Sequence, residues 1–230
     1  KMKAPLLEEL IKYHNKQNLL LSMPGNKSGR TYCIDELGRE FMNNMGRMDI
    51  TEVDNLDNLH APEGVIKEAQ KLLAKTYGVN KAYFLVNGSS SGNLAAIFSA
   101  FSEGDEVLVE RNCHKSIYNG IILRKLKVVY IDPAIDEDLG IFLPSGEKEI
   151  NEAISKAKNP KGIILTNPNY FGVCYDYKRI IKNLREKGLK VIIDSAHGAH
   201  FGVCEKLPES MASLGDYVVV SAHKTLPSLT

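Results

Sequence analysis

Apolar residues recur at two different spacings along this chain, and the spacing changes near residue 62. In the first part, leucine and isoleucine residues recur at helical spacing between Pro5 and Lys16, which predicts a first helix. A polar, glycine-containing segment without periodicity, MPGNKSGR, follows at residues 23–30. We interpret residues 1–45 as an N-terminal arm. The polar segment is either a surface loop or a loop that reaches a ligand or a partner subunit.

From residue 62 onward, short apolar runs alternate with helical patterns. Residues 62–77 have helical spacing, and Gly78 is a typical residue to end such a helix. The predicted strands are Ala82–Val86, Glu106–Glu110, Lys127–Ile131, Gly162–Thr166, Lys190–Asp194 and Asp216–Ser221. Further helices are predicted at Ser91–Phe101, Glu147–Lys158 and Asp176–Lys187. Strands separated by helices indicate βαβ units, so residues 46–230 are predicted to form an α/β domain with a mainly parallel sheet and flanking helices.

Composition and charge are those of a soluble protein without a special class of partner. The chain has 230 residues, of which 43% are hydrophobic and 25% charged. A net charge of +1 gives no reason to expect a nucleic-acid partner, and the apolar runs are too short for a membrane helix. The cysteines are scattered and form no C-x-x-C pair. This argues against a disulfide framework or a metal site and fits a reducing cytoplasm.

A candidate phosphate site follows the first predicted strand of this domain. The segment NGSSSGN, residues 87–93, joins that strand to an apolar helix. Gly88 lets the backbone turn closely, Ser89 and Ser90 carry hydroxyl donors, and free N–H groups at a helix N-terminus attract an anion. The segment lacks the lysine of a P-loop and the spacing of G-x-G-x-x-G, so neither nucleotide motif applies. The alternative is a serine-rich helix cap.

Candidate contacts to a planar ring follow the ends of two other predicted strands. His114, in the segment NCHKS, could stack on such a ring, or it could be a capping or surface histidine. Asp194 ends an apolar run, where an unpaired carboxylate would be costly, so a cationic partner such as a pyridinium nitrogen is implied. The alternative is an aspartate that caps the next turn. Ala196 is small enough for a ring to lie over it, while His197 and His200 can reach ring substituents.

A candidate imine-forming lysine lies in the segment SAHKTLPSLT, residues 221–230, directly after the last apolar run. Desolvation of Lys224 would disfavour its ammonium form, and a neutral amine can attack an aldehyde carbon. Ser221 and His223 could add contacts to a phosphate; the alternative is an ordinary loop lysine. Together, a phosphate cup, a ring-stacking group, a carboxylate and such a lysine match pyridoxal 5′-phosphate (PLP), whose protonated pyridine acts as an electron sink.

Five segments of the chain resemble the Orn/Lys/Arg decarboxylases, the bacterial basic amino-acid decarboxylases among the fold-type-I PLP enzymes. These are MDITEVDNLDNLHAPEG (48–64), NGSSSGNLAAI (87–97), RNCHKSIYNG (111–120), DSAHGAHFG (194–202) and SAHKTLPSLT (221–230). The resemblance implies that Lys224 forms the imine with the cofactor and that Asp194 binds the pyridine nitrogen. It implies that His114 stacks on the ring and that His197 lies near the reactive side. It also implies phosphate contacts from Ser89, Ser90, Ser221 and His223.

The resemblance further implies a fold and an activity. The fold is the large, PLP-binding domain of a fold-type-I transferase-like enzyme. The activity is PLP-dependent α-decarboxylation of lysine, arginine or ornithine to an amine and CO2. This is a reaction of polyamine biosynthesis, carried out by a cytoplasmic homodimer or higher homo-oligomer without a metal. Two alternatives stay open: another PLP reaction, such as transamination or C–C cleavage, and a catalytically inactive paralogue or fragment.

Two features depart from the family pattern. Asn26 stands in the arm segment PGNKSG where relatives usually carry histidine, so the resemblance assigns no role to this position. Family domains also continue beyond the cofactor lysine with an antiparallel strand inside the sheet and a smaller C-terminal domain. We therefore expect that the chain is truncated after Lys224 and folds poorly alone. Glu52, Asp54 and Asp57 could receive the distal cation of a substrate, but a surface role is the simpler interpretation.

Overall fold

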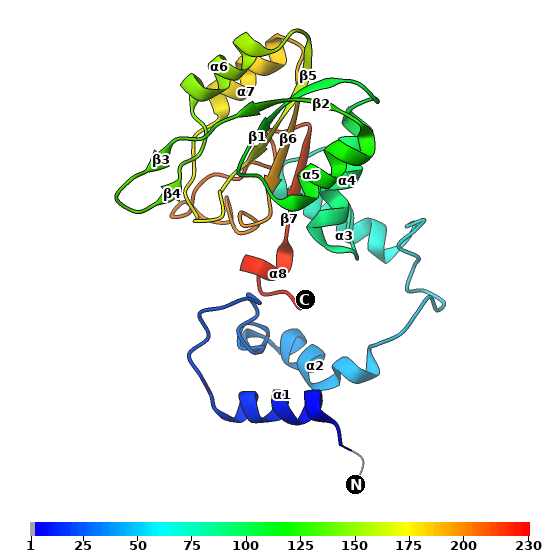
Figure 1. The fold of residues 1–230 in the computed structure, drawn as a ribbon. Helices are drawn as coiled ribbons and strands as arrows, with labels where there is room; N and C mark the ends of the chain where they lie inside the picture. Colours follow the sequence, from blue (N-terminus) through cyan, green and yellow to red (C-terminus); the bar gives the residue numbers. More distant parts are fainter. Residues whose placement is uncertain (1–2) are drawn as a thin grey trace.

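A five-stranded parallel sheet lies at the centre of the larger part of the structure (Figure 1). The computed structural model describes residues 3–230. The strands lie in the order β2 (Lys127–Ile131), β1 (Glu106–Glu110), β5 (Pro160–Thr166), β6 (Lys190–Ser195) and β7 (Tyr217–Val220). Because all neighbouring strands are parallel, their carboxyl ends meet at one edge of the sheet. At this edge Asp194 lies between Thr166 and Val219.

Helices cover both faces of the sheet. One face is covered by α4 (Gly88–Ala100) and α5 (Lys115–Arg124), and the other by α6 (Glu147–Lys156) and α7 (Lys178–Glu186). Successive side chains of a strand point to opposite faces. In β6, Ile192 therefore packs with α4 and α5, while Val191 and Ile193 pack with α6 and α7. Since both faces are buried, the central strands have continuous apolar sequences rather than alternating ones.

Smaller elements connect and extend this sheet. α3 (Val65–Tyr77) precedes the sheet and ends at Gly78 in the left-handed conformation. β3 (Ile135–Asp136) and β4 (Ile141–Phe142) form a separate antiparallel hairpin. α8 (Ala222–Thr225) is a four-residue helix directly after β7. No helix within residues 3–230 is both long and apolar enough to cross a membrane.

The structure confirms the predicted fold class and most of the predicted elements. Five of the six predicted strands are present, and β1 and β2 have the predicted bounds. The predicted helices correspond to α1 (Pro5–Asn15), α3, α4, α6 and α7, although α4 begins at Gly88 instead of Ser91. The sequence patterns did not predict α2 (Glu36–Asn44), α5 or α8. The α/β architecture with a mainly parallel sheet and flanking helices is therefore established for residues 62–230.

The predicted strand at Ala82–Val86 is wrong. Within the described residues this segment pairs with no strand, and the sheet ends at β7. Residues 83–86 of this segment are exposed, with Tyr83 at 67% and Val86 at 78%. An apolar run becomes a strand only where a neighbouring strand pairs its N–H and C=O groups, and this run has no such neighbour.

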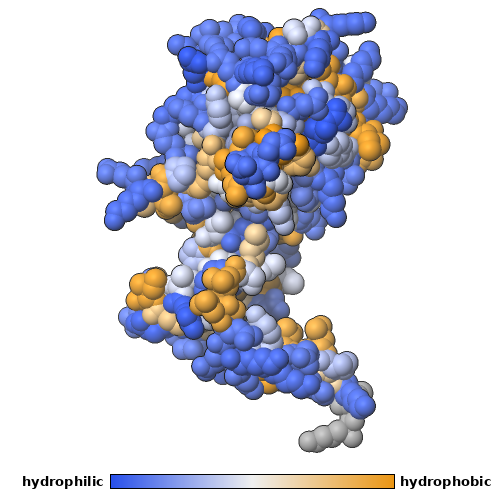
Figure 2. All heavy atoms as spheres, turned by 60° about the vertical axis from the view of Figure 1, so that its left-hand side comes forward, coloured by the Kyte–Doolittle hydropathy of each residue, from blue (hydrophilic) through white to orange (hydrophobic). Residues whose placement is uncertain are grey.

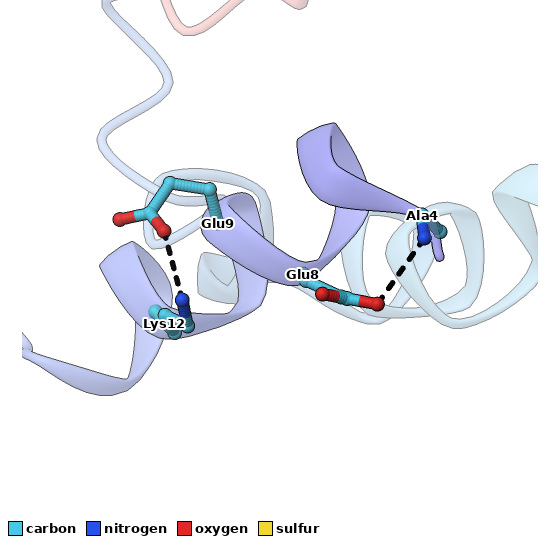
Figure 3. Close-up of polar contacts among 4 residues, drawn as sticks. All are labelled: Ala4, Glu8, Glu9 and Lys12. Carbon is cyan, nitrogen blue, oxygen red and sulfur yellow. Dashed lines mark hydrogen bonds and ion pairs between the residues drawn. The ribbon is translucent and has the colours of Figure 1, made fainter. Parts of the chain in front are cut away.

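The N-terminal arm lies apart from the sheet, with the C-terminal tail between the two (Figure 1), and Figure 2 shows a narrow waist there. The arm contains α1, α2 and the 3-10 helices Tyr32–Ile34 (η1) and Met45–Arg47 (η2). The polar contacts of α1 drawn in Figure 3 are local. The N–H of Ala4 donates to Glu8 at 3.2 Å, and Lys12 pairs with Glu9 at 3.1 Å. No residue of α1 is buried, so its apolar face is exposed.

Asp57 stabilises the start of α3. Its carboxylate accepts hydrogen bonds from the backbone N–H groups of Glu63, Gly64 and Ile66 at 2.8 to 3.0 Å. N–H groups at a helix start have no partner inside the helix, so these bonds satisfy them. The bonds lower the pKa of Asp57 to about 2, and the bond from Glu63 contributes most. Asp57 thus serves the fold, and its role toward a substrate cation stays a prediction.

Replacing Asp57 by alanine should lower the free energy of unfolding, because these N–H groups lose their acceptor. The folded-state pKa of about 2 lies below the ordinary value of 3.8. The stabilisation is therefore fully present above pH 3.8 and is lost as the pH falls toward 2. Thermal melts of wild type and Asp57→Ala across this range measure the effect. Asp54→Ala, which removes an exposed carboxylate of the same segment, is the control. A difference that stays constant with pH would contradict this account.

Candidate active site

Asp194, near the end of β6, is the centre of the candidate site. Its side chain is only 3% exposed. Oδ1 accepts a hydrogen bond from the N–H of Ala196 at 3.1 Å, so Asp194 does cap the turn after the strand. Oδ2 accepts one from the side-chain amide of Asn93 at 2.9 Å. Among the described residues, no lysine, arginine or histidine forms an ion pair with it. A buried carboxylate without a cation is costly, which fits a site for a positively charged ligand atom.

A chain of hydrogen bonds connects Asp194 to His114 through two residues that the sequence patterns missed. Asn93, on α4, is 1% exposed and donates through Nδ2 to Asp194 and to the hydroxyl of Ser116, each at 2.9 Å. Nδ1 of His114 lies 2.8 Å from the same hydroxyl and also accepts the N–H of Ser116. His114 is therefore the capping residue of α5, as one interpretation of the sequence expected, and its exposed ring is held by this network.

The close approach of α4 to β7 brings Asn93 within reach of Asp194. Gly92 makes this approach possible, because a Cβ at this position would lie 2.6 Å from Leu85 Cδ1 and 2.9 Å from Val219 Cγ1. Val219 is the β7 residue paired with Asp194. The helix and the strand that border the site are thus in direct contact at Gly92, and this contact brings Nδ2 of Asn93 to Oδ2 of Asp194.

Lys224 lies beside His197. Its Nζ is 3.2 Å from Nε2 of His197, and both side chains are half-buried, so the desolvation expected for Lys224 is partial. Burial is the main cause that lowers the pKa of His197, and the positive charge of Lys224 is the second. His197 is therefore neutral near neutral pH, and its Nε2 can accept a hydrogen bond from Lys224. The charges of Asp194 and His114 also act on His197, so these four predicted residues share one local environment.

The predicted phosphate cup lies at the start of α4. Gly88 is the first helical residue, and Ser89 and Ser90 follow in the first turn. The N-cap residue, Asn87, makes no hydrogen bond to the helix through its side chain. Free N–H groups at a helix start can bind an anion, so this end of α4 is suited to a phosphate.

The other predicted site residues lie near these groups, but their roles stay predictions. Ala196 and Ser221 are buried, the first in the turn after Asp194 and the second at the start of α8. His223 is half-buried on α8, and Nδ1 of His200 is buried without a partner in the described part of the chain. Within residues 3–230, no side-chain hydrogen bond joins Ser221 or His223 to the start of α4.

Two buried ionisable groups nearby have structural roles. Burial, with the charge of Glu110, raises the pKa of Cys113 to about 12, so this thiol is not a nucleophile near neutral pH. Glu110 is 1% exposed and accepts the N–H groups of Thr166 at 2.6 Å and Ser145 at 3.2 Å. In the described part of the chain, no group of three or more His, Cys, Asp or Glu side chains is placed to hold a metal ion.

Comparison with known proteins identifies the family. The family model described as "Orn/Lys/Arg decarboxylase, major domain" matches residues 4–230. The chain belongs to the Orn/Lys/Arg decarboxylase family. The resemblance carried by the five sequence segments is therefore confirmed over nearly the whole chain.

Relatives in this decarboxylase family match nearly the whole chain, which spans half of their length or less. Uncharacterized protein YaaO of Bacillus subtilis is 40% identical over 232 residues, which cover 100% of this chain and 48% of the relative. An arginine decarboxylase of Bacillus cereus is 33% identical over 229 residues, which cover 99% of this chain and 49% of the relative. The solved structure of the constitutive lysine decarboxylase of Escherichia coli has 25% identity and a TM-score of 0.64. It covers 99% of this chain and 34% of that one. This likeness confirms the expected fold-type-I architecture.

Replacing Asn93 by aspartate should destabilise the fold by about 3 kcal/mol at neutral pH, because it would put a second carboxylate beside Asp194. Because two carboxylates that share a site repel each other, the loss should shrink in mildly acidic solution. Melts of the ligand-free protein at neutral and at mildly acidic pH measure this. Asn119→Asp, at an exposed position of α5, is the matched control. Equal effects of the two substitutions would show that Asn93 does not contact an ionised Asp194.

Proposed function

We propose that the protein is a PLP-dependent decarboxylase that converts lysine, ornithine or arginine into the corresponding amine and CO2. The observation that carries the proposal is Asp194, a carboxylate 3% exposed at the carboxyl edge of the sheet without a cationic partner among the described residues. In the same site, a lysine contacts a neutral histidine and a helix starts with hydroxyl residues. Membership of the Orn/Lys/Arg decarboxylase family supports the choice of reaction.

The residues of the site fit this cofactor. Asp194 would bind the ring nitrogen, and Lys224 would carry the cofactor through its Nζ. Ser89 and Ser90, with the N–H groups at the start of α4, would hold the phosphate. The exposed ring of His114 would stack on the pyridine. We further assign Gly88, Ser221 and His223 to the phosphate side and Ala196 to the surface under the ring.

The mechanism follows from what these residues can do. When bound, the cofactor supplies a protonated pyridine that accepts the electron pair left behind as the substrate carboxylate departs as CO2. Asp194 would keep the ring nitrogen protonated, and the amide of Asn93 holds Asp194 as a hydrogen-bond acceptor. Neutral His197 accepts a hydrogen bond from Lys224 across their 3.2 Å contact, and Lys224 would return a proton to Cα of the substrate. The buried strand ends limit water around Asp194, which favours loss of a charged carboxylate.

Four further properties are part of the proposal, and family membership motivates them. The partner of the site is a small amino acid with a distal cation. The protein acts in the cytoplasm, in polyamine biosynthesis. Its functional form is a homodimer or a higher homo-oligomer.

The test is a product analysis of the full chain incubated with PLP and each of the three basic amino acids. We expect CO2 and the matching amine from one of them, whereas a transaminase would form a keto acid without CO2. Lys224→Ala should lower turnover by about a thousandfold or more. The variant lacks the amine that would carry the cofactor and transfer a proton to the substrate. Lys206→Ala, at an exposed lysine, is the control. Full turnover by Lys224→Ala would overturn the assignment.

A further inference from the structure

The arm touches the segment that carries Lys224. We define the arm loop as residues 23–30, the polar segment that the sequence left without a role. Its Gly25 donates its N–H to the carbonyl of His223 at 2.7 Å. The side-chain amide of Asn26 donates to the carbonyl of Ser228 at 3.4 Å. Asn26 is only 7% exposed, so this contact is part of a packed interface between the two ends of the chain.

The bond from Gly25 acts on the peptide unit of Lys224 itself. The carbonyl of His223 and the N–H of Lys224 belong to one planar peptide group. A donor fixed on this carbonyl therefore fixes the plane from which the backbone of Lys224 begins. Close approach is essential, because a Cβ at Gly25 would lie 2.3 Å from the carbonyl oxygen of Leu226 and 3.0 Å from the carbonyl carbon of Thr225. Both of these atoms are backbone atoms, which a rotamer change cannot move.

Little else holds this segment in place. α8 has four residues, and none of them is buried. A single helical turn has little stability of its own. Among the described residues, the hydrogen bonds that join residues 222–230 to distant parts of the chain are the two from the arm loop and the contact of Lys224 with His197. The arm loop thus holds the backbone of residues 222–230 in place, whereas His197 contacts only the side chain of Lys224.

We propose that the arm loop positions Lys224, with the N–H of Gly25 on the His223 carbonyl as the contact that matters most. This rests on the proposed function, in which Lys224 carries the cofactor. Gly25 is a positioning residue, since it contacts neither substrate nor cofactor. An arm loop that leaves the tail would free the peptide group between His223 and Lys224 and so misplace Nζ relative to Asp194 and His197.

The test compares Gly25→Ala with Gly46→Ala in the full chain. Both variants add one methyl group to a glycine, in the arm for Gly25 and directly after it for Gly46, but a Cβ at Gly46 meets nothing within 4 Å. Trypsin cleavage at Lys27 and Arg30 reports whether the arm loop is docked. Absorbance during titration with PLP reports the affinity, and a pH titration of the bound cofactor reports the environment of its link to Lys224.

We expect Gly25→Ala to be cleaved faster, to bind PLP about tenfold or more weakly, and to shift the pH midpoint of the bound cofactor. Gly46→Ala should match wild type in all three measurements. Faster cleavage of Gly25→Ala with unchanged affinity and midpoint would overturn the proposal, and so would no change at all. If circular dichroism shows that Gly25→Ala does not fold, Asn26→Ala replaces it in the same three measurements, with the same expected and contradicting results.

The result separates this proposal from the proposed function. If wild type binds no PLP, the proposed function fails, while trypsin cleavage still reports on docking of the arm loop. If wild type binds PLP on Lys224 and Gly25→Ala behaves as wild type, only the positioning role fails.

Discussion

The cost of burying the carboxylate of Asp194 is the constraint on which the site depends. The parallel sheet brings this residue to its carboxyl edge, between Thr166 and Val219, where only 3% of the side chain is exposed. Two neutral donors, the amide of Asn93 and the N–H of Ala196, satisfy part of its hydrogen-bonding capacity. Neither of them neutralises its negative charge. In our proposal a bound cation at this position would complete the site, and this requirement would link the fold to the proposed chemistry.

The two ends of the site are held in different ways. Asp194 is fixed by a central strand and by a helix that packs against β7 at Gly92. Lys224 follows the edge strand on a short helix without buried residues. Its side chain contacts His197, and the backbone next to it accepts a hydrogen bond from the arm. In the proposed function, the end at Asp194 suits a charge that stays in place, while the less constrained end suits a lysine that would exchange its partner during a reaction cycle.

Much of the sheet could be predicted from the sequence, because a strand buried on both faces has a continuous apolar run. The same signal failed at Ala82–Val86, since an apolar run does not reveal whether a neighbouring strand exists. Asp194, His114, His197 and Lys224 could be proposed as site residues because each lies at or soon after the end of an apolar run. Asn93 and Ser116 could not, because their role arises only from the packing of α4 and α5 at the strand ends. A polar Asn within an apolar helix was the one available signal. The arm contact joins residues 25 and 223, and no local pattern predicts so distant a pair.

The central claim is that Lys224 carries a cofactor whose ring lies against Asp194. The most direct measurement is borohydride reduction of the full chain with bound PLP, followed by peptide mapping of the labelled lysine. The account predicts a single label on Lys224, strongly reduced in Asp194→Ala while the apo fold is retained. A label on another lysine, or a folded protein that takes up no PLP, would contradict it.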